Sequence, residues 1–110
     1  MTRLEDLLSK IVALQRRDIE AWMRDGLVKP EKHEGTQVFS DAECARVQLV
    51  CTLHYDLDIE LNSMQVIMSL VDQLHDTRER LQCLSGAVLA QDKTVQSSIL
   101  RIIETQRNAR

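Results

Sequence analysis

Residues 14–39 read LQRRDIEAWMRDGLVKPEKHEGTQVF, and this stretch decides the fold. Apolar side chains recur in it at helical spacing, at Ile19, Trp22 and Met23, and they predict a helix over about residues 16–25. Trp22 is either a contact for a partner or a core anchor, and its spacing from the other two residues favours the core.

A sharp stop and a short wing follow this helix. Gly26 suits a left-handed helix end, and Pro30 prevents the helix from resuming. The polar segment 30–40 contains a glycine and ends in Val38 and Phe39, which we expect to anchor a short hairpin. A helix, a stop and a hairpin in this order predict a winged helix-turn-helix head.

Helices are also predicted on both sides of this segment. Upstream, apolar residues at helical spacing predict a helix that is capped by Thr2 and ends near Val12. Downstream, Ser40 and Glu43 form a capping box, so a third helix should begin at Asp41 and end around residues 55–56. The residues that we expect on its partly buried side are Ala42, Ala45, Val47, Leu49, Val50 and Leu53.

A long helix is predicted from about Asn62 onward. Apolar residues recur in it seven apart, at Ile67, Leu74, Leu81, Val88, Val95 and Ile102. One helix cannot hide such a stripe, so we expect a homodimer with a seam formed by Ile67, Leu74, Leu81 and Val88. The chain turns at Ser85–Gly86 or at Gln91–Asp92, or it extends one dimer arm, and the sequence leaves these alternatives open.

The predicted fold class is therefore all-α, with a winged helix-turn-helix head, a minimal β wing and a long dimerisation helix. We expect residues 1–60 to form the head, including the third helix, and residues 61–110 to form the long helix and a helical tail for self-association. The composition agrees, because 44% of the residues are hydrophobic and only 3% are aromatic, a mix that suits helix packing.

Charge argues against a nucleic acid as the main partner. The formal net charge is −3, with −1 in residues 1–50 and −2 in residues 51–110. Proteins that bind phosphate present a basic surface, and neither half of the chain has one beyond a small patch at Arg16 and Arg17. We therefore expect a protein-binding module.

The sequence predicts neither an enzyme nor a cofactor. It contains no recognisable arrangement of nucleophile, base and orienting group, and no Gly-rich phosphate loop. The thiols of Cys44, Cys51 and Cys83 lack metal-ligand spacing, and we expect them to be reduced and buried. We expect no catalytic residue, no metal ligand and no cofactor. With no signal-peptide pattern and no run of 18 apolar residues, we expect a cytoplasmic protein without a membrane partner.

Several motifs resemble those of a known family. They are DIEAWMRDGLVKP (residues 18–30), a glycine-containing wing that ends in VF, LHYDLDIE (53–60) and SLVDQLHDTRERLQCL (69–84). In this order they resemble the chaperone-modulator family CbpM, whose members are small relatives of MerR-type regulators. The resemblance covers about residues 7–84, and its most specific part is the acidic, leucine-rich connection with the helix that follows it.

This resemblance implies a non-enzymatic regulator that binds the J-domain of a DnaJ-like co-chaperone and so blocks its stimulation of an Hsp70-type chaperone. A J-domain presents a basic helix to its chaperone, and an acidic helical module is complementary to that helix. From charge we expect the contacts to be made by Asp56, Asp58, Glu60, Asp72 and Asp76.

A second resemblance, to DNA-binding MerR-type transcription regulators, rests on Arg24, Gly26, Leu27 and Pro30. That family typically has Arg-Tyr-Tyr in its recognition helix, whereas this chain has Glu20-Ala21-Trp22, and its usual wing arginine is Gln37 here. An acidic side chain repels phosphate, so DNA binding is disfavoured. A third alternative, a purely structural assembly domain, fits the seam but leaves residues 16–39 unexplained.

Overall fold

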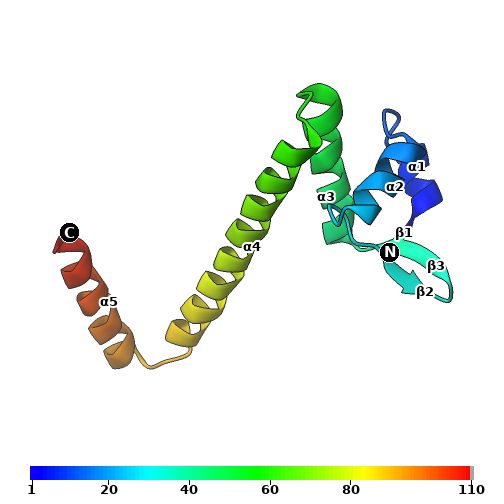
Figure 1. Cartoon of the computed structure of the whole chain (residues 1–110). Coiled ribbons are helices and arrows are strands. Elements are labelled where there is room, and N and C mark those ends of the chain that lie inside the picture. The colour runs from blue at the N-terminus through cyan, green and yellow to red at the C-terminus, as the bar shows by residue number, and fades with distance from the viewer. Residues whose placement is uncertain (110) are drawn as a thin grey trace. The chain divides into compact units, whose positions relative to one another are not determined.

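The computed structural model of the protein describes residues 1–109 and divides into two compact units. We call Met1–Ser69 the head and Leu70–Arg110 the arm. Figure 1 shows the elements of both units, coloured from blue at the N-terminus to red at the C-terminus. The predicted fold class is confirmed, because the chain is mostly helical and combines a winged helix-turn-helix head with a long helix.

The first helix of the head, α1 (Leu4–Lys10), is shorter than the sequence predicts. Ile11 has extended backbone angles, φ −102° and ψ 96°, so the helix ends before Val12. The predicted Thr2 cap is also wrong, because the N-cap is Arg3, which makes no side-chain cap hydrogen bond. Thr2 belongs instead to a short strand, β1 (Thr2–Arg3).

The second helix, α2 (Arg16–Arg24), and its stop follow the prediction closely. Trp22 is a core residue with 4% of its surface exposed, which confirms the structural interpretation of this side chain. The chain leaves the helix through Gly26, whose φ of 78° is a left-handed conformation that glycine adopts without a Cβ clash. The amide of Leu27 then donates to the carbonyl of Trp22 at 2.9 Å and closes the helix end.

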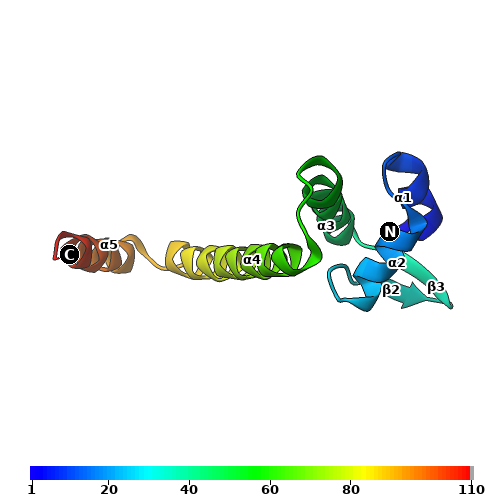
Figure 2. The same cartoon turned by 45° about the horizontal axis from the view of Figure 1, so that its top comes forward.

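The wing is an antiparallel hairpin of β2 (Glu31–His33) and β3 (Thr36–Phe39). Glu34 and Gly35 join the strands, and both have a positive φ, 54° and 78°, as a two-residue hairpin turn requires. The sheet has a third strand that the sequence did not predict, because β1 pairs with the other edge of β3 and gives the order β1-β3-β2. In both views of the chain the hairpin projects beyond the helices of the head (Figures 1 and 2).

The third helix, α3 (Asp41–Cys51), begins where the capping box predicts. The amide of Glu43 donates to the Ser40 hydroxyl oxygen at 3.2 Å, which is one half of the box. A tertiary contact replaces the other half, because the Glu43 carboxylate accepts from the amide of Lys29 at 2.9 Å. The helix continues into a π-helical turn, η1 (Thr52–Asp56), so helical structure ends where the sequence predicts.

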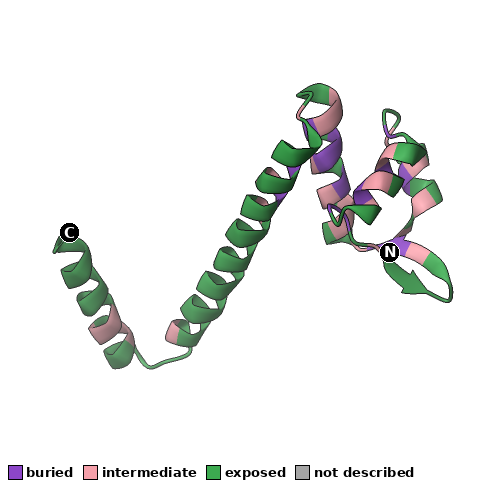
Figure 3. Ribbon diagram, in the orientation of Figure 1, coloured by how far each residue is buried: buried purple, intermediate pink, exposed green. Residues whose placement is uncertain are grey.

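One hydrophobic core holds the head together. It combines residues of α1, α2, the wing and α3 with the first turns of α4 (Leu61–Leu89), and Figure 3 shows the buried residues gathered there. Ala42 and Ala45 were expected on the buried side of α3, but both are exposed. The buried stripe runs through Val47 and Val50, and at about 100° per residue Ala45 lies on the opposite side from Val47.

The first turns of α4 belong to this core. Met64 and Met68 are only 2% and 1% exposed, so they act as packing residues and do not form a surface groove. Ile67, between them, is partly buried and also packs against the core of the head.

In the arm, α4 runs to Leu89 and is followed by α5 (Lys93–Asn108). A turn at Ser85–Gly86 is wrong, because Gly86 is helical and its carbonyl accepts from the amide of Ala90 at 3.0 Å. The alternative at Gln91–Asp92 is confirmed. Asp92 is the N-cap of α5, and its carboxylate accepts from the amide of Val95 at 2.9 Å.

The arm leaves its apolar side chains uncovered. Within the described part of α5 no residue is buried. The exposed large apolar residues of the arm are Leu70, Leu74, Leu81, Leu84, Leu89, Val95, Leu100, Ile102 and Ile103. The tail therefore does not hide the stripe of α4 within one chain. Among residues 1–109, none of the helices combines the length and the apolar composition that a membrane span requires.

Candidate functional site

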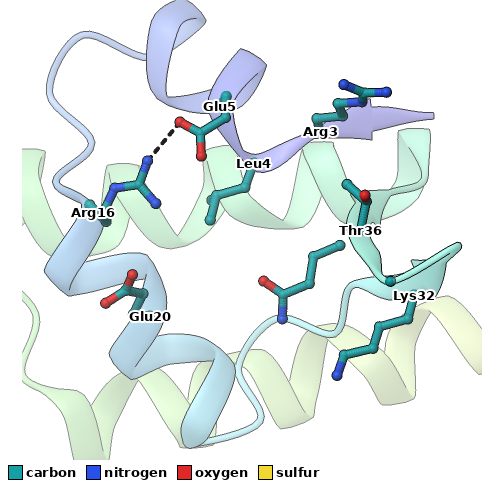
Figure 4. Close-up of a pocket in the computed structure, with 9 residues that line it drawn as sticks. Arg3, Leu4, Glu5, Arg16, Glu20, Lys32 and Thr36 are labelled. Atoms are coloured by element: carbon teal, nitrogen blue, oxygen red, sulfur yellow. Dashed lines mark hydrogen bonds and ion pairs between the residues drawn. The ribbon is translucent and has the colours of Figure 1, made fainter.

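The surface that a winged helix-turn-helix protein offers to a duplex lies between its second helix and its wing. In this head that surface is an open groove of about 540 Å³, which we call the α2–wing groove. Its lining residues are Arg3, Leu4, Glu5, Arg16, Glu20, Lys32, Gly35, Thr36 and Gln37. Figure 4 shows that charged side chains of both signs surround it.

The first cation of α2, Arg16, is already engaged in an ion pair. Arg16 Nη2 lies 2.6 Å from Glu5 Oε2, as the dashed line in Figure 4 marks. The hydrogen bond to Glu5, together with its charge, raises the pKa of the Arg16 guanidinium above its usual value. A phosphate group would therefore have to displace Glu5 in order to pair with Arg16.

The remaining charges of the α2–wing groove do not restore a basic surface. Glu20, on α2 one turn after Arg16, adds a second carboxylate to the groove beside Glu5 of α1. The wing presents the neutral Gln37. The other cations are Arg3 and Lys32, so three cations face two carboxylates. Binding to duplex DNA gains from several uncompensated cations that release counterions, and this groove offers few.

The five predicted partner-binding carboxylates are all exposed, but they belong to two different units. Asp56, Asp58 and Glu60 lie in the head, at the end of η1 and in the connection to α4. Asp58 has a φ of 53°, a left-handed conformation that aspartate tolerates better than most residues. Asp72 and Asp76 lie on α4 in the arm. Within the head, residues 56–60 form one short acidic loop.

The four predicted seam residues are spaced along α4, and they differ in exposure. Leu74 and Leu81 are 55% and 60% exposed, so each presents an apolar side chain to solvent in the protomer. Val88 is partly buried near the end of the helix, and Ile67 packs partly on the core of the head. The exposed part of the stripe is thus carried by Leu74 and Leu81.

A polar and aromatic cluster that sequence analysis missed joins η1 to α2. The Tyr55 hydroxyl donates to Asp18 Oδ2 at 2.5 Å and accepts from the amide of Gln15 at 3.1 Å. Burial, followed by the hydrogen bond to Asp18, raises the pKa of Tyr55 to about 12. The ring of His54 lies against Tyr55 and Trp22, with centroid distances of 4.7 and 5.8 Å. The cluster positions the end of η1, but residues 37 positions apart carry no local sequence signal that would reveal it.

The three cysteines are free thiols in different environments. Cys51 is buried, and its burial raises the pKa of its thiol to about 11, so the reactive thiolate is disfavoured. Cys44 is partly buried, whereas Cys83 is exposed on α4, so the prediction of buried thiols is wrong for Cys83. Over residues 1–109 there is no cluster of three or more His, Cys, Asp or Glu side chains that would hold a metal ion.

Comparison with known families agrees with this architecture. The family described as "MerR HTH family regulatory protein" matches residues 8–85, which span the end of α1, the recognition-type helix, the wing, α3 and most of α4. No curated protein and no solved structure matches the chain. Since the family match covers more than half of the chain and coincides with the winged head and the long helix, this protein belongs to the MerR HTH family of regulatory proteins.

Proposed function

We propose that this protein is a non-enzymatic, CbpM-like modulator that binds the J-domain of a DnaJ-like co-chaperone and inhibits its stimulation of an Hsp70-type chaperone. The observation that carries the proposal is the charge of the head. Its α2–wing groove holds Glu5 and Glu20 where a DNA-binding relative needs cations. Elsewhere in the head, the exposed residues Asp56, Asp58 and Glu60 make the connection to α4 acidic and complementary to a basic partner.

Inhibition would require only that the protein occupy the basic helix of the J-domain. A J-domain uses its basic helix to engage the chaperone, so a module that covers this helix prevents the engagement. Exposed carboxylates such as Asp56 and Glu60 steer a basic partner toward the head and fix its orientation, while apolar contacts supply most of the affinity. No bond is made or broken in this mechanism.

We also propose that the modulator acts as a cytoplasmic homodimer. The arm exposes Leu74 and Leu81 on one stripe of α4, and the tail of the same chain does not cover them. Large exposed apolar stripes on a helix are normally covered by a second helix, and a second copy of the chain carries the same seven-residue repeat.

The J-domain proposal is tested by calorimetric titration of the full chain with an isolated J-domain at moderate salt. We expect saturable binding at micromolar affinity or tighter. In the variant Asp56→Lys combined with Asp58→Asn, the affinity should fall by about tenfold or more, because carboxylates that face basic side chains are lost. Asparagine is chosen at position 58 because it tolerates the φ of 53°.

The matched control for this titration is Glu104→Lys, which changes an exposed charge on α5 in the same direction. Its affinity should stay within about twofold of wild type, apart from a small effect of net charge. Unchanged binding by the Asp56 and Asp58 variant would remove these residues from the interface. Absence of binding by the wild-type chain would refute the proposed function.

DNA binding is the second candidate function, and one observation favours it. Arg3 and Lys32 line the α2–wing groove without an acidic neighbour that pairs with them in the way Glu5 pairs with Arg16. We expect Glu20→Arg to leave the melting temperature nearly unchanged, because Glu20 is exposed, and to raise non-specific DNA affinity by about tenfold at low salt. Fluorescence titration with a random duplex at several salt concentrations measures this. A wild-type chain that already binds one sequence tightly would favour DNA as the partner.

A further inference from the structure

A second groove of the head lies between α1 and α3. Two adjoining hollows of about 280 and 430 Å³ make up this groove, and both are lined by Lys10, Ile11 and Gln48. One wall consists of the end of α1 and the connection to α2, and the other wall consists of α3 and η1. We call it the α1–α3 groove. It shares no lining residue with the α2–wing groove, so it is a separate surface.

The α3 side of this groove is a single stripe of side chains at helical spacing. The residues along it are Asp41, Cys44, Ala45, Gln48, Thr52 and Asp56. Between its two ends the stripe carries no charge, and its small side chains, Cys44, Ala45 and Thr52, permit close approach of another helix. A carboxylate stands at each end. The two carboxylates are 15 positions apart, which corresponds to about 20 Å of helix, or about four turns.

The opposite wall exposes apolar surface that the fold does not use. Val12 is 92% exposed at the tip of the connection between α1 and α2, and Ala13 beside it is exposed as well. Both line the groove, next to the partly buried Ile11. An almost fully exposed valine adds nothing to the core, so its place at the mouth of a groove is informative about binding rather than about folding.

We infer that the α1–α3 groove is the docking surface for an amphipathic helix of the partner, about four turns long, with a small apolar centre and a basic side chain near each end. The length of the stripe fits such a helix, and its two terminal carboxylates match the basic ends. Val12 and Ala13 add apolar surface to the half of the groove that ends at Asp56. This inference rests on the proposed function, in which the helix is the basic helix of the J-domain. Asp56 then belongs to this groove as well as to the acidic loop.

The groove is tested by two arginine substitutions on the same helix. Ala45→Arg fills the centre of the groove, whereas Ala42→Arg adds the same side chain on α3 outside it, and both positions are exposed. In calorimetric titrations of the full chain with an isolated J-domain, we expect Ala45→Arg to weaken binding by about thirtyfold and Ala42→Arg to stay within about twofold of wild type. Val12→Asp, on the other wall, should also weaken binding by about tenfold. Thermal melts of all variants should coincide, because none of the three side chains is buried.

The outcomes separate this inference from the function on which it rests. If the wild-type chain binds the J-domain and Asp56→Lys weakens binding, but Ala45→Arg and Val12→Asp do not, the groove is not the docking surface and the proposed function stands. If the wild-type chain does not bind at all, both are overturned. If Ala45→Arg changes the mass of the assembly in sedimentation, the groove is occupied by a second copy of the chain, and the inferred occupant is wrong.

Discussion

Replacement of Phe39 by alanine is expected to lower the free energy of unfolding of the head by about 3–5 kcal/mol. Phe39 is the only phenylalanine in the chain and has 0% of its surface exposed. It ends β3, stands opposite Thr2 of β1 and belongs to the single core of the head. Its loss leaves a cavity where the wing, α1 and α3 meet. A unit of 69 residues has a total stability of about 3–10 kcal/mol, so this loss is a large part of the stability of the head.

Urea denaturation followed by circular dichroism measures this effect. The matched control is Val12→Ala, which removes an apolar side chain that is 92% exposed, and its stability should lie within about 0.5 kcal/mol of wild type. If Phe39→Ala lost less than about 1 kcal/mol, the wing would not be part of the core. The sheet order β1-β3-β2 would then contribute little to holding the head together.

The double variant Leu74→Asp, Leu81→Asp is expected to convert the proposed dimer into monomers. Each aspartate would place a charge in the apolar seam, at a cost of several kcal/mol per position and copy. In the protomer both leucines are more than half exposed, so the stability of a single chain should hardly change. The variant therefore separates assembly from folding. Sedimentation velocity measures the mass, and circular dichroism measures the helix content.

A control with the same change in charge is Ser69→Asp combined with Gln82→Asp. Both residues are exposed on α4 and lie away from the seven-residue stripe. This control should remain dimeric, with an increase in the dissociation constant of less than about threefold. A leucine variant that kept the wild-type mass would show that α4 does not form the interface through Leu74 and Leu81.

The fold was predictable wherever a local chemical requirement sets the backbone. Gly26 and Pro30 define the end of α2, Ser40 defines the start of α3, and Asp92 starts α5. Features that depend on distant residues were not predictable. Strand β1 forms only because β3 offers a free edge 35 to 37 residues later in the chain. The early end of α1 at Ile11 likewise carries no local sequence signal.

The candidate site was predictable in its composition but not in its contacts. Glu20 and Gln37 already indicated that the recognition surface is a poor match for phosphate. The ion pair between Glu5 and Arg16 joins residues of different helices, so no spacing rule reveals it. The α1–α3 groove likewise appears only when α1 and α3 pack together, because neither helix has a hollow surface by itself.

The two carboxylates of the α2–wing groove have a consequence for how this protein can change through mutation. Glu5 and Glu20 are both exposed, and neither helps to build the core. Folding therefore places no constraint on either position, and two single-residue changes would leave Arg3, Arg16 and Lys32 as the only charges of the groove. Two substitutions would thus give this head a groove with only positive charges, which is the kind of surface that binds nucleic acid. The two carboxylates that offset the positive charge of this groove are therefore not required by the fold.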